Sequence, residues 1–109
     1  MAYDETTAHE IRAHFHTISG ITEKKLFGGI GFMLHGNMAC GLNGADLIVR
    51  LGQAEFIQAM QQPHVRVFDL SGRPMQGWIL VAPAGYTPEA ALKAWVEKGV
   101  QFARSLPPK

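Results

Sequence analysis

The segment that decides the fold of this chain is Lys24–Leu51, KKLFGGIGFMLHGNMACGLNGADLIVRL. It combines many glycines with large apolar side chains and carries few charges. A flexible linker lacks the apolar surface that drives burial, so the segment is not interpreted as a linker. Three interpretations remain: a phosphate-binding loop, a hinge, or strands in which glycine serves packing and turns.

The first interpretation requires a specific arrangement of residues around the phosphate. A P-loop has the pattern GxxxxGK[ST], in which the lysine reaches the phosphates and the hydroxyl binds the metal. Here Gly28, Gly29 and Gly31 lead into Phe32 without that lysine and hydroxyl. A dinucleotide-binding fingerprint requires a preceding strand and a following helix, and the sequence predicts neither. We therefore interpret the glycines as structural positions of strands and turns.

Turn residues divide the segment into runs of five to nine residues. Gly36-Asn37 and Gly44-Ala45 are typical of tight turns. The sequence therefore predicts three antiparallel strands at about 26–34, 38–43 and 46–51.

Two-residue hairpins would set the register of these strands. In that register Met33 faces Cys40, Cys40 faces Val49, and Phe32 lies opposite Gly41. Leu42 faces Leu47 in the same register. A slip of one residue would exchange the two faces of the sheet.

The predicted register gives the strands a second face that is unusually apolar for a solvated surface. Exposed apolar patches of this kind usually mark a contact. We therefore expect this face to pack against a second copy of the chain, which would make the protein a homodimer. The face carries Ile30, Phe32, Leu34, Ala39, Ile48 and Arg50.

The segment before the strands reads as a helix over about residues 7–19. Thr7 and Glu10 have the spacing of a capping box, in which each side chain bonds the other's free backbone N–H. Gly20 can supply the left-handed residue that follows a helix.

The segment after the strands alternates helices and strands. A short helix is predicted over 53–61, strands over 65–68 and 77–82, and a final helix that begins at the N-cap Thr87 and continues to Leu106. The predicted order is α-β-β-β-α-β-β-α. This order indicates an α+β, two-layer fold with an antiparallel-rich sheet and helices against it, formed by residues 1–109 as a single domain.

Composition limits the class of protein. The net charge is +1 and the charges are scattered, so direct nucleic acid binding is not expected. Cys40 is the only cysteine, which excludes an intramolecular disulfide and suits a reducing cytosol. The N-terminus lacks the features of a signal peptide, and no apolar run approaches ~18 residues. We expect a cytoplasmic protein without a membrane span.

No set of side chains has the spacing of a reaction centre. Cys40 lies in a predicted central strand among apolar neighbours, which is typical of an inert structural thiol. The histidines lack the clustering that a metal site requires. We therefore predict no catalytic residue, no metal site and no cofactor. The histidines are His9, His14, His16, His35 and His64.

Three polar or aromatic residues remain candidates for contacts. Arg73 and Trp78 are of types that are enriched at binding hot spots, although a turn leading to a strand with a core tryptophan explains them equally well. Arg50 stands on an apolar strand face. It is either an ion-pair partner across an interface or a side chain whose stem packs while its charge reaches water.

An ordered set of short motifs resembles the N-terminal domain of the TfoX/Sxy family. The resemblance covers roughly residues 8–106, with Leu26 where the family more often has methionine. The motifs are KLFGG (25–29), GF (31–32), GNM (36–38), DL (46–47), VR (49–50), GRPM (72–75) and GW (77–78), followed by Val81 and the final helix with Trp95.

The resemblance implies a two-layer α/β fold similar to secretion-chaperone-like domains, which often pair. Full-length members of the family regulate natural competence in bacteria, act with a DNA-bound activator and carry a second, C-terminal helical domain. We expect this chain to be a standalone N-terminal domain that lacks the second one. The resemblance brings no catalytic residue set.

These observations favour a non-enzymatic regulatory or protein-interaction domain that is homodimeric, binds an unidentified regulatory protein and is connected through the resemblance to transcriptional regulation. The alternative is a small ligand-binding protein or enzyme with a pocket near Arg50 and Arg73. Direct DNA binding is the least favoured function because the charges are dispersed.

Overall fold

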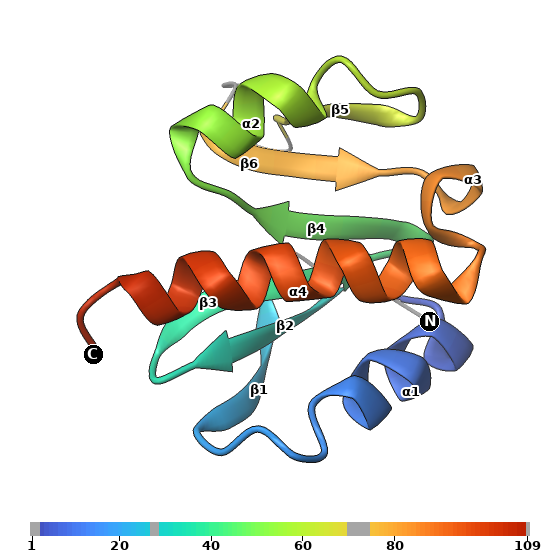
Figure 1. Cartoon of the computed structure of the whole chain (residues 1–109). Helices are drawn as coiled ribbons and strands as arrows, with labels where there is room; N and C mark the ends of the chain where they lie inside the picture. Colours follow the sequence, from blue (N-terminus) through green and yellow to red (C-terminus); the bar gives the residue numbers. More distant parts are fainter. Residues whose placement is uncertain (1–2, 27–28, 70–74, 109) are drawn as a thin grey trace.

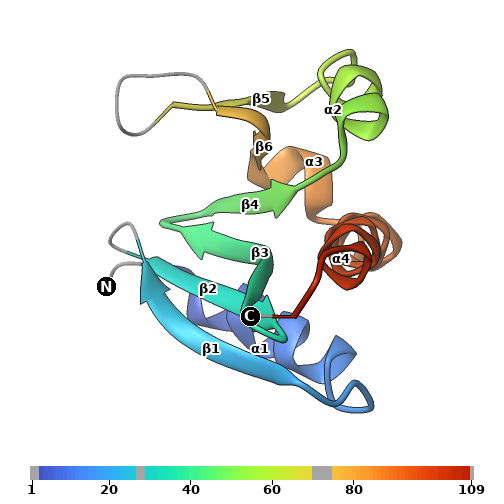
Figure 2. The same cartoon turned by 90° about the vertical axis from the view of Figure 1, so that its left-hand side faces the viewer.

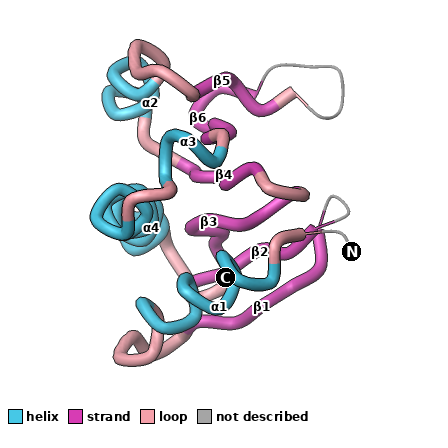
Figure 3. Tube along the Cα trace, turned by 90° about the vertical axis from the view of Figure 1, so that its right-hand side faces the viewer, coloured by secondary structure: helices cyan, strands magenta, loops and turns pink. Residues whose placement is uncertain are grey.

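The computed structural model describes residues 3–26, 29–69 and 75–108. One sheet and a layer of helices form the fold, which confirms the predicted α+β class (Figure 1). The described helices lie on one face of the sheet (Figures 2 and 3). The elements are α1 (Glu5–His14), β1 (Ile21–Leu26), β2 (Gly29–Leu34), β3 (Asn37–Asn43), β4 (Asp46–Arg50), α2 (Gln53–Ala59), β5 (Val65–Phe68), β6 (Met75–Val81), α3 (Pro83–Tyr86) and α4 (Glu89–Ser105).

The six strands lie in the order β1-β2-β3-β4-β6-β5, and every neighbouring pair is antiparallel. The predicted element order is found with two additions, the edge strand β1 and the short helix α3. The range 26–34, predicted as one strand, spans parts of two strands in the structure. β1 ends at Leu26, and β2 begins at Gly29. β1 has the exposed charges Glu23, Lys24 and Lys25, which are common on edge strands because they discourage further strand pairing.

The β3–β4 hairpin has the predicted register. Cys40 pairs with Val49, and Leu42 pairs with Leu47. Asn43 pairs with Asp46, so that Gly44 and Ala45 form the predicted two-residue turn. Gly44 has a φ of +59°, which the absence of a side chain permits.

The β2–β3 hairpin differs from the predicted register. Its turn residues are His35 and Gly36, with φ of +51° and +85°, the combination that a type I′ turn requires. A bulge beside Phe32 and Met33 then shifts the pairing, so that Phe32 pairs with Cys40. The predicted pairs Met33 with Cys40 and Phe32 with Gly41 are therefore wrong.

This shift moves three predicted contact residues to the face that the helices cover. Ile30, Phe32 and Leu34 are 5%, 0% and 1% exposed and belong to the main core. The rings of Phe32 and Phe15 lie 5.5 Å apart between centroids. Their predicted place on an exposed apolar face is wrong.

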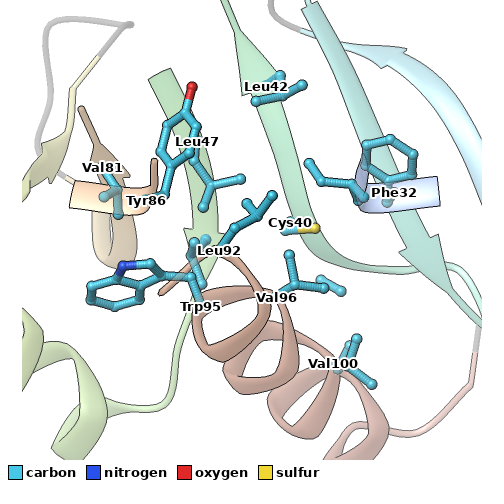
Figure 4. Packing of buried hydrophobic residues seen from close by; sticks show 14 of the residues in the cluster. Phe32, Cys40, Leu42, Leu47, Val81, Tyr86, Leu92, Trp95, Val96 and Val100 are labelled. Atoms are coloured by element: carbon cyan, nitrogen blue, oxygen red, sulfur yellow. The ribbon is translucent and has the colours of Figure 1, made fainter. Parts of the chain in front are cut away.

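The main core fills the space between the sheet and α4 (Figure 4). Leu92, Trp95, Val96 and Val100 point from α4 toward the strands (Figure 4). Gly99 lets α4 approach the sheet closely, because a Cβ atom at this position would lie 2.1 Å from the carbonyl oxygen of Ala39. The backbones of α4 and β3 are therefore in direct contact.

Two helix starts differ from the predicted ones. α1 begins after Asp4, whose carboxylate accepts hydrogen bonds of 3.0 Å from the Thr6 N–H and the Thr7 hydroxyl. An aspartate at the N-cap satisfies a free N–H as well as the predicted threonine would. α4 begins at Glu89 with Pro88 as N-cap. Thr87 is instead the C-cap of α3 and donates its N–H to the carbonyl oxygen of Pro83, the first residue of that helix.

Candidate interaction surface

The side chain of Arg50 lies between two aromatic rings. Arg50 is the last residue of β4 and pairs with Trp78 of β6. Its guanidinium carbon is 5.0 Å from the ring centroid of Trp78 and 5.3 Å from that of Phe102 in α4. Both distances fall within the range of favourable cation–π contacts. We call this arrangement of Arg50, Trp78 and Phe102 the arginine clamp.

The clamp holds the guanidinium close to two aromatic rings but gives its N–H donors no hydrogen-bond acceptor among the described residues. Among the described residues, Arg50 takes part in no ion pair and no hydrogen bond from its side chain. A guanidinium has five N–H donors in a fixed planar fork that matches a carboxylate. The clamp therefore fixes the direction of a positive charge that the described part of the chain does not neutralise.

A second apolar cluster lies on the sheet face that the described helices leave uncovered. It contains Met38, Ile48, Phe68 and Leu80, with Met33 and Trp78 packed against it. Trp78 meets Phe68 edge-on at 6.0 Å between centroids, so the clamp is anchored in this cluster. Ile48, a predicted contact residue, is buried here.

The structure brings together only part of the predicted contact set. Arg50 and Trp78 touch, and Ile48 lies in the cluster that supports them. Arg73 lies outside the described residues. Phe102 completes the clamp and was not predicted, because its partnership with Arg50 depends on how α4 crosses the sheet.

The outer side of α2 is a second feature that the sequence analysis missed. Ile57 and Met60 are 53% and 37% exposed, and they are the large apolar side chains exposed on the described surface. From residue 53 to residue 62 the chain has one charged side chain, Glu55, which forms an ion pair of 2.9 Å with Lys98. The rest of this side of α2 carries amides and apolar groups.

The arginine clamp has a small hollow beside it. The hollow has a volume of about 220 Å³ and is lined by Gly52, Glu55, Lys98, Gln101 and Phe102. Ligand pockets usually have volumes of roughly 300–1,000 Å³. The hollow is thus smaller than a usual small-molecule site.

The groups with shifted pKa values lie away from the clamp. Burial raises the pKa of the Cys40 thiol, which keeps it protonated and inert, and burial likewise raises the pKa of Tyr86. The hydrogen bond to Glu23 raises the pKa of Arg12. None of these groups lines the hollow beside Phe102. Within the described ranges, no three His, Cys, Asp or Glu residues are placed to hold a metal ion.

A search of the described helices found none that is both long and apolar enough to cross a membrane.

Comparison with known proteins found one family. The family model described as the TfoX N-terminal domain matches residues 13–103, a range that contains the arginine clamp and α2. No curated protein and no solved structure matched the chain.

Proposed function

We propose that this chain, which belongs to the TfoX N-terminal domain family, is a non-enzymatic regulatory domain that works by binding another protein. The observation that carries the proposal is the arginine clamp. The process we propose is transcriptional regulation in the bacterial cytoplasm, on the basis of the family resemblance.

The clamp has the properties of a binding hot spot. Arginine and tryptophan are the residue types most enriched at such sites, and both are held in place before a partner arrives. Restraining a long side chain in advance lowers the entropy that binding would otherwise cost, by about 0.5–1.5 kcal/mol for one such side chain. A carboxylate of a partner protein is the group that matches the unused N–H donors of Arg50.

Protein binding fits this site better than small-molecule binding or catalysis. The alternative was a pocket near Arg50 and Arg73. The hollow beside Phe102 is small, and the groups with shifted pKa values lie elsewhere. A partner surface needs no enclosed pocket, only a fixed cation with apolar surroundings.

We further propose that the chain forms a homodimer through α2. Two copies of this helix related by a two-fold axis would place Ile57 and Met60 against each other. Depletion of charge is typical of the centre of an interface, and the outer side of α2 shows it. Because a stable interface buries about 800 Å² on each partner and α2 is short, we expect a weak dimer.

The test of the clamp is capture of partners from the native host with the wild-type chain and two variants. Arg50→Met keeps the length of the side chain but removes its charge. Arg66→Met is the matched control, because Arg66 is an exposed arginine paired with Asp46 on the surface. We expect one set of partners with wild type and Arg66→Met, and loss of that set with Arg50→Met. Recovery of the same set by a folded Arg50→Met variant would refute the proposal.

The test of the homodimer is the molar mass measured by light scattering over increasing protein concentration. We expect wild type and Gln58→Asp to dimerise and Ile57→Asp to remain monomeric. Gln58 is exposed on the same helix and controls for the added charge. A wild-type chain that stays monomeric at all concentrations would contradict the dimer but not the clamp.

A further inference from the structure

A cleft lies in the helical layer, on the outer side of the core. It has a volume of about 550 Å³ and lies between the end of α1, with the residues that follow it, and one side of α4. This volume is within the usual range for small-molecule sites, roughly 300–1,000 Å³. The cleft is separate from the arginine clamp, whose three residues do not line it.

The lining of the cleft is amphipathic. Its floor is apolar and comes from both sides, with Phe15 and Ile18 after α1 and Val96 and Val100 on α4. Its rim is polar and contains His14, Thr17, Lys93, Glu97, Gln101 and Arg104. An apolar floor with a few polar groups at the rim is the usual composition of a site that orients an amphiphilic ligand.

The charges of the rim are not used inside the described part of the protein. The ion pairs among the described residues join other side chains, so that Lys93, Glu97 and Arg104 have no ionic partner within the described part of the chain. Glu97 is four residues from Lys93 on α4, a spacing that partly compensates both charges. Arg104 is seven residues from Glu97, about 10 Å along the helix axis, so its charge is the uncompensated one.

We infer that this cleft binds a small molecule with an apolar body and one carboxylate group. The carboxylate accepts hydrogen bonds from the guanidinium of Arg104, and the body lies over Val100 and Ile18. Thr17 and Gln101 also line the cleft and can donate further hydrogen bonds. Glu97 disfavours a second negative charge farther along the cleft, which selects a monoanion.

The probe for the test is octanoate, below its micelle concentration, titrated into the full isotope-labelled chain and followed through backbone amide chemical shifts. Octanol and octylammonium are matched controls with the same apolar body and a different charge. We expect octanoate to shift amides in 13–18 and 93–104. We expect octanol to bind about tenfold more weakly, which corresponds to one charge-assisted hydrogen bond, and octylammonium not to bind.

Two variants locate the site and its charge. Arg104→Gln should weaken octanoate binding about tenfold and leave octanol binding unchanged, whereas Arg66→Gln should change neither. Ile18→Trp, at a partly exposed position, should fill the cleft and abolish binding of both probes. The amide spectrum of each variant shows whether it is folded.

Three results would overturn the inference. One is octylammonium binding as tightly as octanoate, and another is shifts that do not gather around the cleft. The third is an Arg104→Gln variant that has reduced thermal stability but unchanged octanoate affinity. In that case the charge of Arg104 would only stabilise the C-terminal end of α4, where the helix dipole is negative. None of these results bears on the arginine clamp, whose test uses a different surface.

Discussion

Replacing Gly99 by alanine tests how closely α4 lies on the sheet. The added Cβ would be 2.1 Å from the carbonyl oxygen of Ala39 and 2.9 Å from its carbonyl carbon. Ordinary contact begins at 3.4 Å, so the helix or the strand must move by about 1.3 Å. The obstacle is backbone in the middle of a sheet, which cannot rotate away as a side chain could.

The expected cost follows from two opposing effects. Overpacking of a core typically costs about 1–3 kcal/mol, and a backbone clash of this size belongs at the upper end. Alanine is favoured over glycine inside a helix by about 1 kcal/mol. The expected net loss of unfolding free energy is therefore about 2 kcal/mol, or roughly 10 °C in melting temperature for a domain of this size.

Urea denaturation of wild type and Gly99→Ala measures this loss. Ala94→Gly is the matched control, because Ala94 is exposed on the same helix and reports the helix-propensity effect with opposite sign. A Gly99→Ala chain as stable as wild type, or more stable, would refute the direct contact between α4 and the backbone of β3.

Three further predictions concern other parts of the core and the helix cap. Phe32→Asp should prevent folding, because the side chain is fully buried and an unpaired charge there is costly. Ile57→Asp, at an exposed position, should fold, and circular dichroism distinguishes the folded from the unfolded variant. Cys40 should react with a thiol reagent only as fast as the chain unfolds. Above about pH 9 the thiol of the unfolded chain ionises, while burial keeps Cys40 protonated in the folded chain. The unfolding free energy should therefore fall by up to about 1.4 kcal/mol per pH unit, and denaturation of Cys40→Ala should show a smaller dependence on pH. Asp4→Ala should lower the unfolding free energy by about 1 kcal/mol in urea titrations, because the Thr6 N–H loses its acceptor, and an unchanged midpoint would contradict this cap.

The two hairpins show what a pattern of residues can determine. The β3–β4 register followed from a two-residue turn at Gly44-Ala45. The β2–β3 register did not follow from the sequence pattern. Both faces of these strands are apolar, so the alternation of side chains is compatible with either face pointing toward the core. The bulge beside Phe32 accompanies the burial of this side chain in the main core, and no local pattern of the sequence predicts it.

The candidate site was predictable as residue types but not as an arrangement. Arg50 and Trp78 were singled out one at a time, and the pairing of β4 with β6 brings them together although 27 residues separate them along the chain. Phe102 enters the clamp only through the placement of α4. The apolar residues Phe56 and Ile57 of α2 and its C-cap Met60 are close in sequence, and the packing of the helix decides that Phe56 turns inward.

The strand order β1-β2-β3-β4-β6-β5 places the first four strands side by side in chain order and then pairs β4 with β6. β1–β4 are joined by short local connections, whereas the pairing of β4 with β6 closes a much longer loop and so carries a larger entropic cost. We call the boundary between β4 and β6 the seam. We expect native-state opening to start at this seam, where amide exchange at Ile79 and Val81 would report it. The arginine clamp bridges the seam and adds α4 to it. Binding of a partner to Arg50 would therefore slow amide hydrogen exchange at the seam. Partner binding could then be measured as a change in the opening rate of the sheet.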